Sequence, residues 1–511
     1  MSNIRDTDLV LVSRGGTPYD CPASDLSSRL QDNDYLLVSR GGTPYKVSGS
    51  NINNISDNDT LLISRGSTPY KVTGADFKSL LGSTYSIDWD ADSFAASGVT
   101  YASGVEVAIV INDIVENSFG ESYALGFLDW ATNSANRDLF VFKINSNGTV
   151  AWQRSIRTVK TEFGLQGCAD SNGDLVLIAY QATSSNLVGS MVAKVDRNGN
   201  VSNQSLYERP SSNQHVYPKG IVPAGNGKFL VCAYVYNSSM AFWRLNSDLS
   251  YDSSFSPFQF TSSTNVGEKI HGDGSNIYAM SPSHGGIVRP LYFVKSDLNG
   301  NVVWSKTYTS SKTLAARSVY GIDGTSVFMW NETRGSSGGN FSTNAVAKFD
   351  TSGNLLFYRS FAQNASDSTN ITQDSEGNTY ILMTAGSVSH VAKLDNSGNT
   401  VWMKRCQVSY PYFGVQLPSA IQINAQGMLA ISFNMIMIVV NPDGNFNGTY
   451  GSHVTLTVMD DPLTTYTSSW GTFSAGGVGK ESFYFDSSSL GPNSVSQTVN
   501  THSFNHASNS I

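Results

Sequence analysis

Alternating carboxylates are the first residues of this chain that could do chemistry. Asp88, Asp90 and Asp92 stand at every second position, as the oxygen ligands of a calcium loop do. The segment lacks the sharp-turn glycine and the distal glutamate of such a loop, so a solvated linker strand is the favoured interpretation. His502 and His506 are spaced to share a helix face, but the Ser, Asn and Thr around them favour strand or coil. The sequence therefore predicts no metal and no cofactor.

Motifs for catalysis are missing from the sequence as well. It contains no phosphate-binding loop, no zinc-protease helix and no nucleophile elbow. The four cysteines form no metal or redox pattern, and buried thiols are expected for Cys168 and Cys232. Carboxylate pairs that hydrolyse glycosides are close in space rather than in sequence. We therefore predict a non-enzymatic protein, with a polysaccharide-degrading enzyme as one alternative.

Aromatic side chains in predicted loops are better candidates for binding. Tyr217 stands in one loop-like segment, and Tyr410, Tyr412 and Phe413 stand in another. Aromatic faces stack on sugars and also anchor protein interfaces. These four residues are the candidate binding residues, and local packing between neighbouring structural units is the alternative.

A turn that occurs seven times defines the elements that must position these side chains. An Asp or Asn stands three residues before a fixed position, which is glycine in every copy except the third, where it is Leu249. The copies are Asn145/Gly148, Asp196/Gly199, Asn246/Leu249, Asp297/Gly300, Asp350/Gly353, Asp395/Gly398 and Asn441/Gly444. This pattern suits a type I turn whose last residue has positive φ, and apolar runs on both sides make each copy a β-hairpin. Most copies also carry a basic residue before the turn and an aromatic residue after it, for which packing between units is expected.

A second series of glycines, out of phase with the first, completes the architecture. Its members each precede an apolar run and are Gly120, Gly173, Gly227, Gly274, Gly324, Gly377 and Gly427. Two hairpins in each period of about 50 residues give four strands per blade and seven blades. The predicted fold class is all-β, with a seven-bladed β-propeller over residues 105–450 that opens with Val105–Ile111 and ends at about Tyr450. A β-solenoid is the alternative, although its rungs are normally far shorter.

A different repeat fills residues 1–82. Each of its three copies has an apolar strand, a Gly/Pro turn and a short return strand, at Asp6–Tyr19, Asp32–Tyr45 and Asp57–Tyr70. Hairpins of this size bury too little apolar surface to fold alone, so they must pack on each other, on the propeller or on a partner. The predicted organisation is this hairpin arm, a linker over 83–104, the propeller, and a short C-terminal β extension over 451–511.

Three arginines recur in this arm, at the start of each turn: Arg14, Arg40 and Arg65. They are the candidate residues for docking. A ligand-binding role would need three equal sites, so arginines that bond turn carbonyls or neighbouring carboxylates are the favoured interpretation.

Charge and hydropathy exclude several classes of protein. Basic residues number 32 against 40 acidic ones, giving a net charge of −8, which argues against a nucleic-acid surface. No run of apolar residues is long enough to span a membrane, and the N-terminus lacks the apolar run of a signal peptide. Production in a reducing cytoplasm is expected, with no membrane insertion.

The arm resembles short repeated modules of tailed-phage virion structural proteins, especially those of marine cyanophages. The similarity lies in an aspartate, a leucine-rich strand and the sequence Arg-Gly-Gly-Thr-Pro-Tyr. The blade repeat is similar to bacterial SBBP-type repeats, as in Lys393–Trp402, with Leu249 and Val439 as departures from the pattern. The first resemblance implies attachment to other phage tail proteins through residues 1–82, and it brings no catalytic residues. The second implies only a propeller.

Together these features predict a virion protein, made in the host cytoplasm, that is a fibre-like component of the tail or baseplate. The propeller would present a surface for adhesion to a host glycan or protein, in several copies or as a homo-oligomer. A purely architectural role in decorating the tail or neck is the main alternative, and a polysaccharide-degrading tail enzyme is the second.

Overall fold

The computed structural model of the chain describes only strands and the turns that join them. All regular elements in this part of the chain are β-strands, which confirms the predicted all-β class. The described residues are 9–14, 17–22, 34–40, 43–48, 60–65, 68–73, 85–88, 107–130, 138–145, 150–157, 161–182, 188–207, 216–235, 240–261, 269–282, 290–311, 314–333, 341–385, 388–409, 419–424, 427–433, 436–444, 448–450, 454–460, 465–466, 471–475, 479–482, 498–501 and 509–510.

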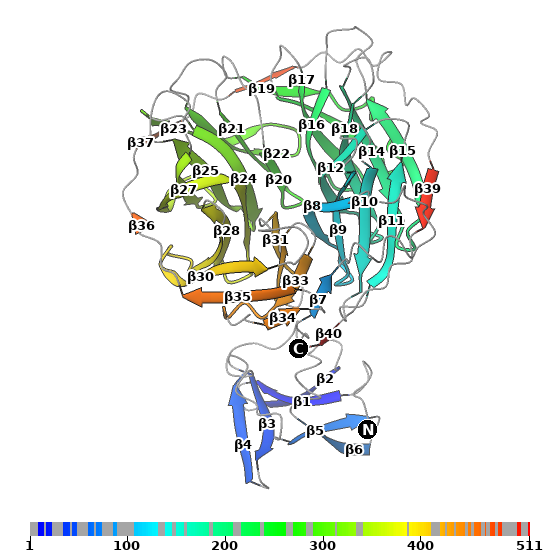
Figure 1. Cartoon of the computed structure of the whole chain (residues 1–511), viewed down its shortest axis with the longest axis vertical. Helices are drawn as coiled ribbons and strands as arrows, with labels where there is room; N and C mark the ends of the chain where they lie inside the picture. Colours follow the sequence, from blue (N-terminus) through cyan, green and yellow to red (C-terminus); the bar gives the residue numbers. More distant parts are fainter. Residues whose placement is uncertain are drawn as a thin grey trace.

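The main body is a ring of seven antiparallel sheets, and the predicted seven-bladed β-propeller is therefore confirmed (Figure 1). Each blade runs from an inner strand at the ring centre to an outer strand. Blade 1 contains β8 (Val107–Glu116), β9 (Ser122–Trp130), β10 (Asp138–Ile144) and β11 (Val150–Arg157). Blade 2 contains β12 (Thr161–Ala169), β13 (Leu175–Ala182), β14 (Val188–Val195) and β15 (Val201–Tyr207). Blade 3 contains β16 (Val216–Pro223), β17 (Phe229–Val235), β18 (Met240–Leu245) and β19 (Phe258–Thr261).

The next three blades follow the same order. Blade 4 contains β20 (Lys269–Gly272), β21 (Asn276–Pro282), β22 (Leu291–Asp297) and β23 (Val302–Ser310). Blade 5 begins with β24 (Leu314–Ile322), β25 (Thr325–Thr333) and β26 (Phe341–Phe349). Its outer strand is the first part of β27 (Leu355–Gln373), whose last part is the inner strand of blade 6. Blade 6 continues with β28 (Thr379–Ala385), β29 (Val388–Leu394) and β30 (Thr400–Ser409).

Blade 7 is closed by a strand from the other end of the chain. Its own strands are β31 (Ala420–Ile423), β32 (Leu429–Phe433) and β33 (Ile436–Val440). The outer strand is β7 (Tyr85–Asp88), which precedes blade 1 and pairs antiparallel with β33. This corrects two predictions: part of the 83–104 linker belongs to the propeller, and blade 7 does not complete itself by running on to Tyr450. The residues Gly448–Tyr450 form β34, which pairs with β35 (Val454–Asp460) instead.

The C-terminal extension surrounds the ring as a belt. We use the name C-terminal belt for β35, β36 (Thr465–Tyr466), β37 (Gly471–Ala475), β38 (Gly479–Ser482), β39 (Thr498–Thr501) and β40 (Asn509–Ser510). In chain order these strands pair with outer strands of blades 6, 5, 4, 3, 1 and 7, so the belt runs backwards around the ring (Figure 1). Outer strands otherwise present unpaired backbone groups, and in these six blades the belt pairs with part of them.

The three hairpins of the arm pack on each other. They are β1 (Leu9–Arg14) with β2 (Thr17–Pro22), β3 (Asp34–Arg40) with β4 (Thr43–Ser48), and β5 (Thr60–Arg65) with β6 (Thr68–Thr73). The first strands of the hairpins, β1, β3 and β5, pair with one another in all three combinations. One six-stranded sheet results, which gives the individually marginal hairpins mutual support.

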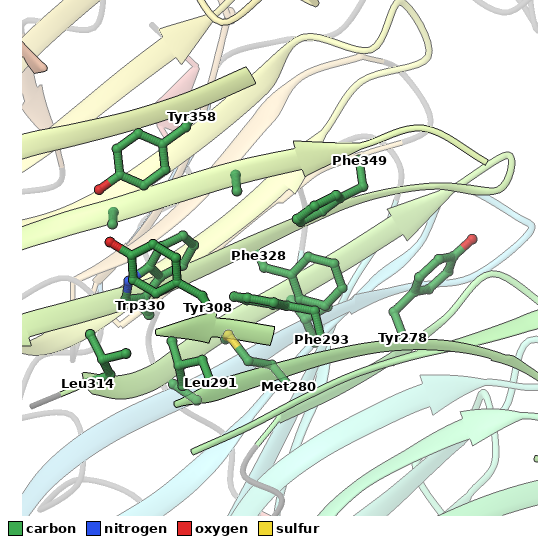
Figure 2. Close-up of a cluster of buried hydrophobic side chains, with 14 of the residues drawn as sticks. Tyr278, Met280, Leu291, Phe293, Tyr308, Leu314, Phe328, Trp330, Phe349 and Tyr358 are labelled. Atoms are coloured by element: carbon green, nitrogen blue, oxygen red, sulfur yellow. The ribbon is translucent and has the colours of Figure 1, made fainter. Parts of the chain in front are cut away.

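The hydrophobic core lies between blades rather than at one centre. Adjacent sheets pack face to face, and each of six clusters joins one blade to the next. The cluster between blades 4 and 5 is rich in aromatic rings, including Phe293, Tyr308, Phe328 and Trp330, all fully buried (Figure 2). Phe293 and Phe328 meet edge to face with ring centroids 5.0 Å apart, a favoured geometry for aromatic pairs.

Candidate functional site

The repeated Asp/Gly turn is explained by local hydrogen bonding. In blade 4, Asp297 Oδ1 accepts from the backbone nitrogens of Asn299 at 2.9 Å and Asn301 at 2.8 Å. Its Oδ2 accepts from the Asn301 side-chain amide at 2.7 Å. Gly300 closes the turn at φ 82°, in the left-handed region where a side chain is strained. The carboxylate therefore has its partners within the turn, which gives it a structural role.

The basic and aromatic residues of the repeat lock each blade to the next. Lys295 Nζ of blade 4 donates to the carbonyl of Gly324 in blade 5 at 2.9 Å. Trp304 of blade 4 lies over the turn glycine of blade 5, Gly353, where a Cβ would come within 2.8 Å of the indole. Blades 5 and 6 present Phe357 and Trp402 to the next turn glycine in the same way.

A charge cluster joins blades 1 and 2. Glu121 forms ion pairs at 2.8 Å with both Lys143 of its own blade and Arg197 of the next blade. Burial alone would raise the pKa of Glu121, but the hydrogen bonds from Arg197 and Lys143 outweigh it and lower the pKa to about 2. The guanidinium of Arg197 also lies 4.0 Å from the ring centre of Phe119. All these groups are partnered with each other, so the cluster stabilises the contact between the blades.

The ring encloses a cavity of about 600 Å³ that is the candidate binding site. Its wall is formed by the inner strands of all seven blades, so residues from Asn112 to Gln422 converge there. Polar and charged side chains are prominent in this wall. The volume lies in the range of small-molecule sites, which is roughly 300–1,000 Å³.

Some of the polar residues in the wall tie the inner strands of different blades together. Asp113 of blade 1 accepts from the backbone nitrogen of Gly167 in blade 2 at 3.0 Å. Gln166 of blade 2 donates to the carbonyl of Ile270 in blade 4 at 3.2 Å. Ser318 of blade 5 donates to Asn370 of blade 6 at 2.9 Å. These bonds satisfy backbone and side-chain groups along the inner edges, which have no further strand to pair with.

Two titratable groups in the wall have strongly shifted pKa values. Burial raises the pKa of Asp113 to about 7, against the opposing effects of hydrogen bonds from Gly167 and Ile114 and of the charge of Lys269. Burial also lowers the pKa of His271 to about 4, so its imidazole is neutral at pH 7. The His271 ring lies 4.3 Å from the ring of Tyr320, centroid to centroid.

Three cations line the cavity from three consecutive blades. Lys219 comes from blade 3, Lys269 from blade 4 and Arg317 from blade 5. Arg317 also donates to the side-chain oxygen of Asn331. Among the described residues of the wall, the carboxylates are Asp113 and Glu116, both from blade 1.

The residues predicted to bind from loops have a different placement. Tyr217 lies in β16 rather than in a loop, and its half-buried ring stacks on Tyr180 at 6.0 Å and on Tyr234 at 5.8 Å. It therefore packs between blades 2 and 3, and it does not line the cavity. Tyr410, Tyr412 and Phe413 lie outside the described residues.

The docking arginines are placed only by their backbone. Arg14, Arg40 and Arg65 end β1, β3 and β5, opposite Thr17, Thr43 and Thr68 of the return strands. Their role in docking stays a prediction.

Some residues of the metal and thiol predictions lie in the described part of the chain and others lie outside it. Asp88 is the last residue of β7, while Asp90, Asp92, His502 and His506 lie outside the described residues. Within the described part of the chain no group of three or more His, Cys, Asp or Glu side chains could hold a metal. Cys168 and Cys232 are buried free thiols, as expected, and burial raises the pKa of both. The described part of the chain also contains no helix that could span a lipid bilayer.

Sequence reasoning missed the cavity residues altogether. They lie in the strands just before the second series of glycines, and no single one of them forms a motif. A usable signal is a charged or amide residue at the same register position of several inner strands. Asp113, Gln166 and Lys269 of blades 1, 2 and 4 show it, each opposite an apolar residue of the second strand.

Comparison with known proteins adds only distant similarities. No protein-family model matches the chain, and no curated protein matches its sequence. A streptogramin B lyase structure is 12% identical, with 70% of this chain and 97% of that chain covered and a TM-score of 0.40. A protein of unknown function from Bacteroides caccae is 12% identical, with 67% and 98% covered and a TM-score of 0.32. The Dos1 propeller is 10% identical, with 65% and 92% covered and a TM-score of 0.38. The fold is established by the blade topology of the chain itself.

Proposed function

We propose that this chain is a non-enzymatic structural protein of a phage virion. Residues 1–82 attach it to other tail or baseplate proteins, and the propeller is held outward for adhesion to a host-surface glycan or protein. The observation that carries the proposal is the three-copy module of the arm, because its Arg-Gly-Gly-Thr-Pro-Tyr pattern resembles modules of tailed-phage virion proteins.

The way in which the ring is closed supports a role as a rigid platform. β7 joins blade 7 from the N-terminal side, and the C-terminal belt pairs with outer strands of six blades. Opening the ring requires these strand pairings to break. Five of the outermost belt strands have only two to five residues, and short edge strands disfavour pairing between neighbouring copies, which suits a protein present in many copies on one particle.

The arm has the organisation expected of a separate docking unit. Its three hairpins form one sheet through β1, β3 and β5, and the arm lies outside the ring (Figure 1). Because the three hairpins belong to one sheet, the arm can attach to a partner as a single body.

Location in purified particles tests the proposal. Particles from cells that express the full chain should contain it, as detected by mass spectrometry and by antibody labelling of the tail. A variant that lacks residues 1–82 keeps β7 and should be absent from particles, while its far-ultraviolet circular dichroism remains that of a folded propeller. Absence of the full chain from particles refutes the virion assignment.

Adhesion has a test of its own. The fluorescently labelled full chain should bind host cells and should be displaced by the unlabelled chain. Failure to bind while the chain is present in particles would show an architectural role, and release of oligosaccharides from host polysaccharide would overturn the non-enzymatic assignment.

A further inference from the structure

The cavity at the ring centre has charges of opposite sign on opposite sides. Lys219, Lys269 and Arg317 come from blades 3, 4 and 5, whereas Asp113 and Glu116 come from blade 1. Because seven blades form a closed ring, blades 4 and 5 lie across the cavity from blade 1, and blade 3 lies next to blade 4. A ligand that fills the cavity therefore meets a cationic wall on one side and carboxylates on the other.

Backbone irregularities place several of these side chains. In β8, β12, β16 and β24 the pairing with the next strand skips one residue, and in β8, β16 and β24 the skipped residues are Asn112, Lys219 and Arg317. A β-bulge redirects the side chain of the extra residue, and bulges are enriched beside functional sites. Asn112, Lys219 and Arg317 all line the cavity, although they come from different blades.

The balance of charge favours an anion. Among the described residues of the wall, three cations face two carboxylates, a difference of one positive charge. Burial raises the pKa of Asp113 to about 7, so this carboxyl is only partly ionised near neutral pH and the positive excess is larger. Arginine and lysine bind carboxylate and phosphate groups through charge-assisted hydrogen bonds.

The remaining groups of the wall favour a ligand with many hydroxyls. Gln166, Asn370 and Gln422 offer amides, and Asp113 and Glu116 offer carboxylate oxygens that accept from hydroxyl groups. A polar ligand suits this lining better than a purely apolar one, which would form no hydrogen bonds with these groups. A metal cation would be repelled by the three cationic side chains of the opposite wall.

We propose that the central cavity binds an acidic sugar, with its anionic group on Lys219, Lys269 and Arg317 and its hydroxyls on the amide and carboxylate groups opposite. The cavity of about 600 Å³ has room for one or two sugar rings. A carboxylated sugar at the end of a surface glycan and a free sugar phosphate share this chemistry. With a surface glycan as the source of the sugar, the cavity would be the binding site for the proposed adhesion. Binding of the sugar itself does not depend on the adhesion function.

Titration of the purified full chain with glucuronic acid tests the proposal, followed by ligand-observed nuclear magnetic resonance. Neutral glucose is the matched control, and glucose 6-phosphate represents the phosphate source. Glucuronate should saturate with a dissociation constant below about 10 mM, and glucose should bind at least about tenfold more weakly because it lacks the anionic group. Tighter binding of glucose 6-phosphate than of glucuronate would assign a phosphorylated sugar within the proposed class.

Variants locate the bound sugar. Lys219→Gln and Lys269→Gln should each weaken glucuronate binding about tenfold, while Lys306→Gln on the outer strand β23 should leave it unchanged. Circular dichroism of each variant checks the fold. No saturation by either acidic sugar, equal binding of glucose, or full binding by both cavity variants would overturn the proposal. The virion assignment is tested by particle composition, so the two can fail separately.

Discussion

Among the described blade turns, one lacks glycine at the left-handed position and has Leu249 there instead. Replacement of Leu249 tests how the blades pack. The residue has φ 64° and is fully buried in the cluster between blades 2 and 3. In other blades, an aromatic residue of the preceding blade covers the turn glycine, as Trp304 covers Gly353. In blade 2 the equivalent register position, opposite Lys194, is Asn203. We infer that the Leu249 side chain fills the space that an aromatic ring fills elsewhere.

Two opposing free-energy terms set the effect of Leu249→Gly. Removal of a buried leucine side chain costs about 2–5 kcal/mol, including the cavity that remains. Glycine relieves about 1–2 kcal/mol of left-handed strain but adds roughly 0.5–1 kcal/mol of chain entropy. The expected net loss of stability is therefore about 0.5–5 kcal/mol. Leu249→Ala keeps the strain and loses most of the burial, so it should be less stable than Leu249→Gly by up to about 1 kcal/mol.

A double substitution tests the inferred exchange directly. Asn203→Trp alone should cost about 1–3 kcal/mol, because the indole and the leucine compete for one space. Combined with Leu249→Gly, the tryptophan should cover the new glycine and recover most of the lost stability, a coupling of about 2 kcal/mol or more. Urea denaturation followed by tryptophan fluorescence measures all four chains. A Leu249→Gly protein as stable as the parent, or a double variant no better than either single one, would refute the reasoning.

Three further predictions concern the ring closure, the inner strands and the charge cluster. Deletion of residues 1–104 should lower the melting temperature of the propeller more than deletion of residues 1–82 does, because only the longer deletion removes β7 from blade 7. Equal melting temperatures would contradict closure of the ring by β7. Gly321→Ala should cost about 1–3 kcal/mol in urea denaturation, since a Cβ would overlap the fully buried ring of Tyr278, and unchanged stability would show that the ring can move aside. The folded-state pKa of Glu121, about 2, lies below its ordinary 4.5, so its contribution is complete above pH 4.5 and is lost as pH falls from 4.5 towards 2. Glu121→Gln should remove about 3 kcal/mol at pH 7 and flatten stability against pH in that window, which urea titrations at several pH values would measure.

The sequence alone determined the features of this protein that are local and periodic. The Asp-to-Gly spacing of the turns indicates hairpins, because an Asx turn and a left-handed glycine need only neighbouring residues, as at Asp297 and Gly300. Repetition about every 50 residues then gives the number of blades. The roles of Lys295 and Trp304 in blade packing were also predictable from their fixed places in the repeat.

Only the tertiary structure decided what depends on closing the ring. β7 and the C-terminal belt pair through backbone groups on outer edges, and such pairing leaves little trace in side-chain pattern. Tyr217 looked like a loop aromatic because it stands before Pro218 in a loop-like segment, but stacking with Tyr180 and Tyr234 places it between blades. The cavity residues Lys219 and Arg317 lie about a hundred positions apart and become neighbours of one space only when seven inner strands converge. Periodicity along the chain determines what each blade is, whereas long-range geometry determines what the blades enclose.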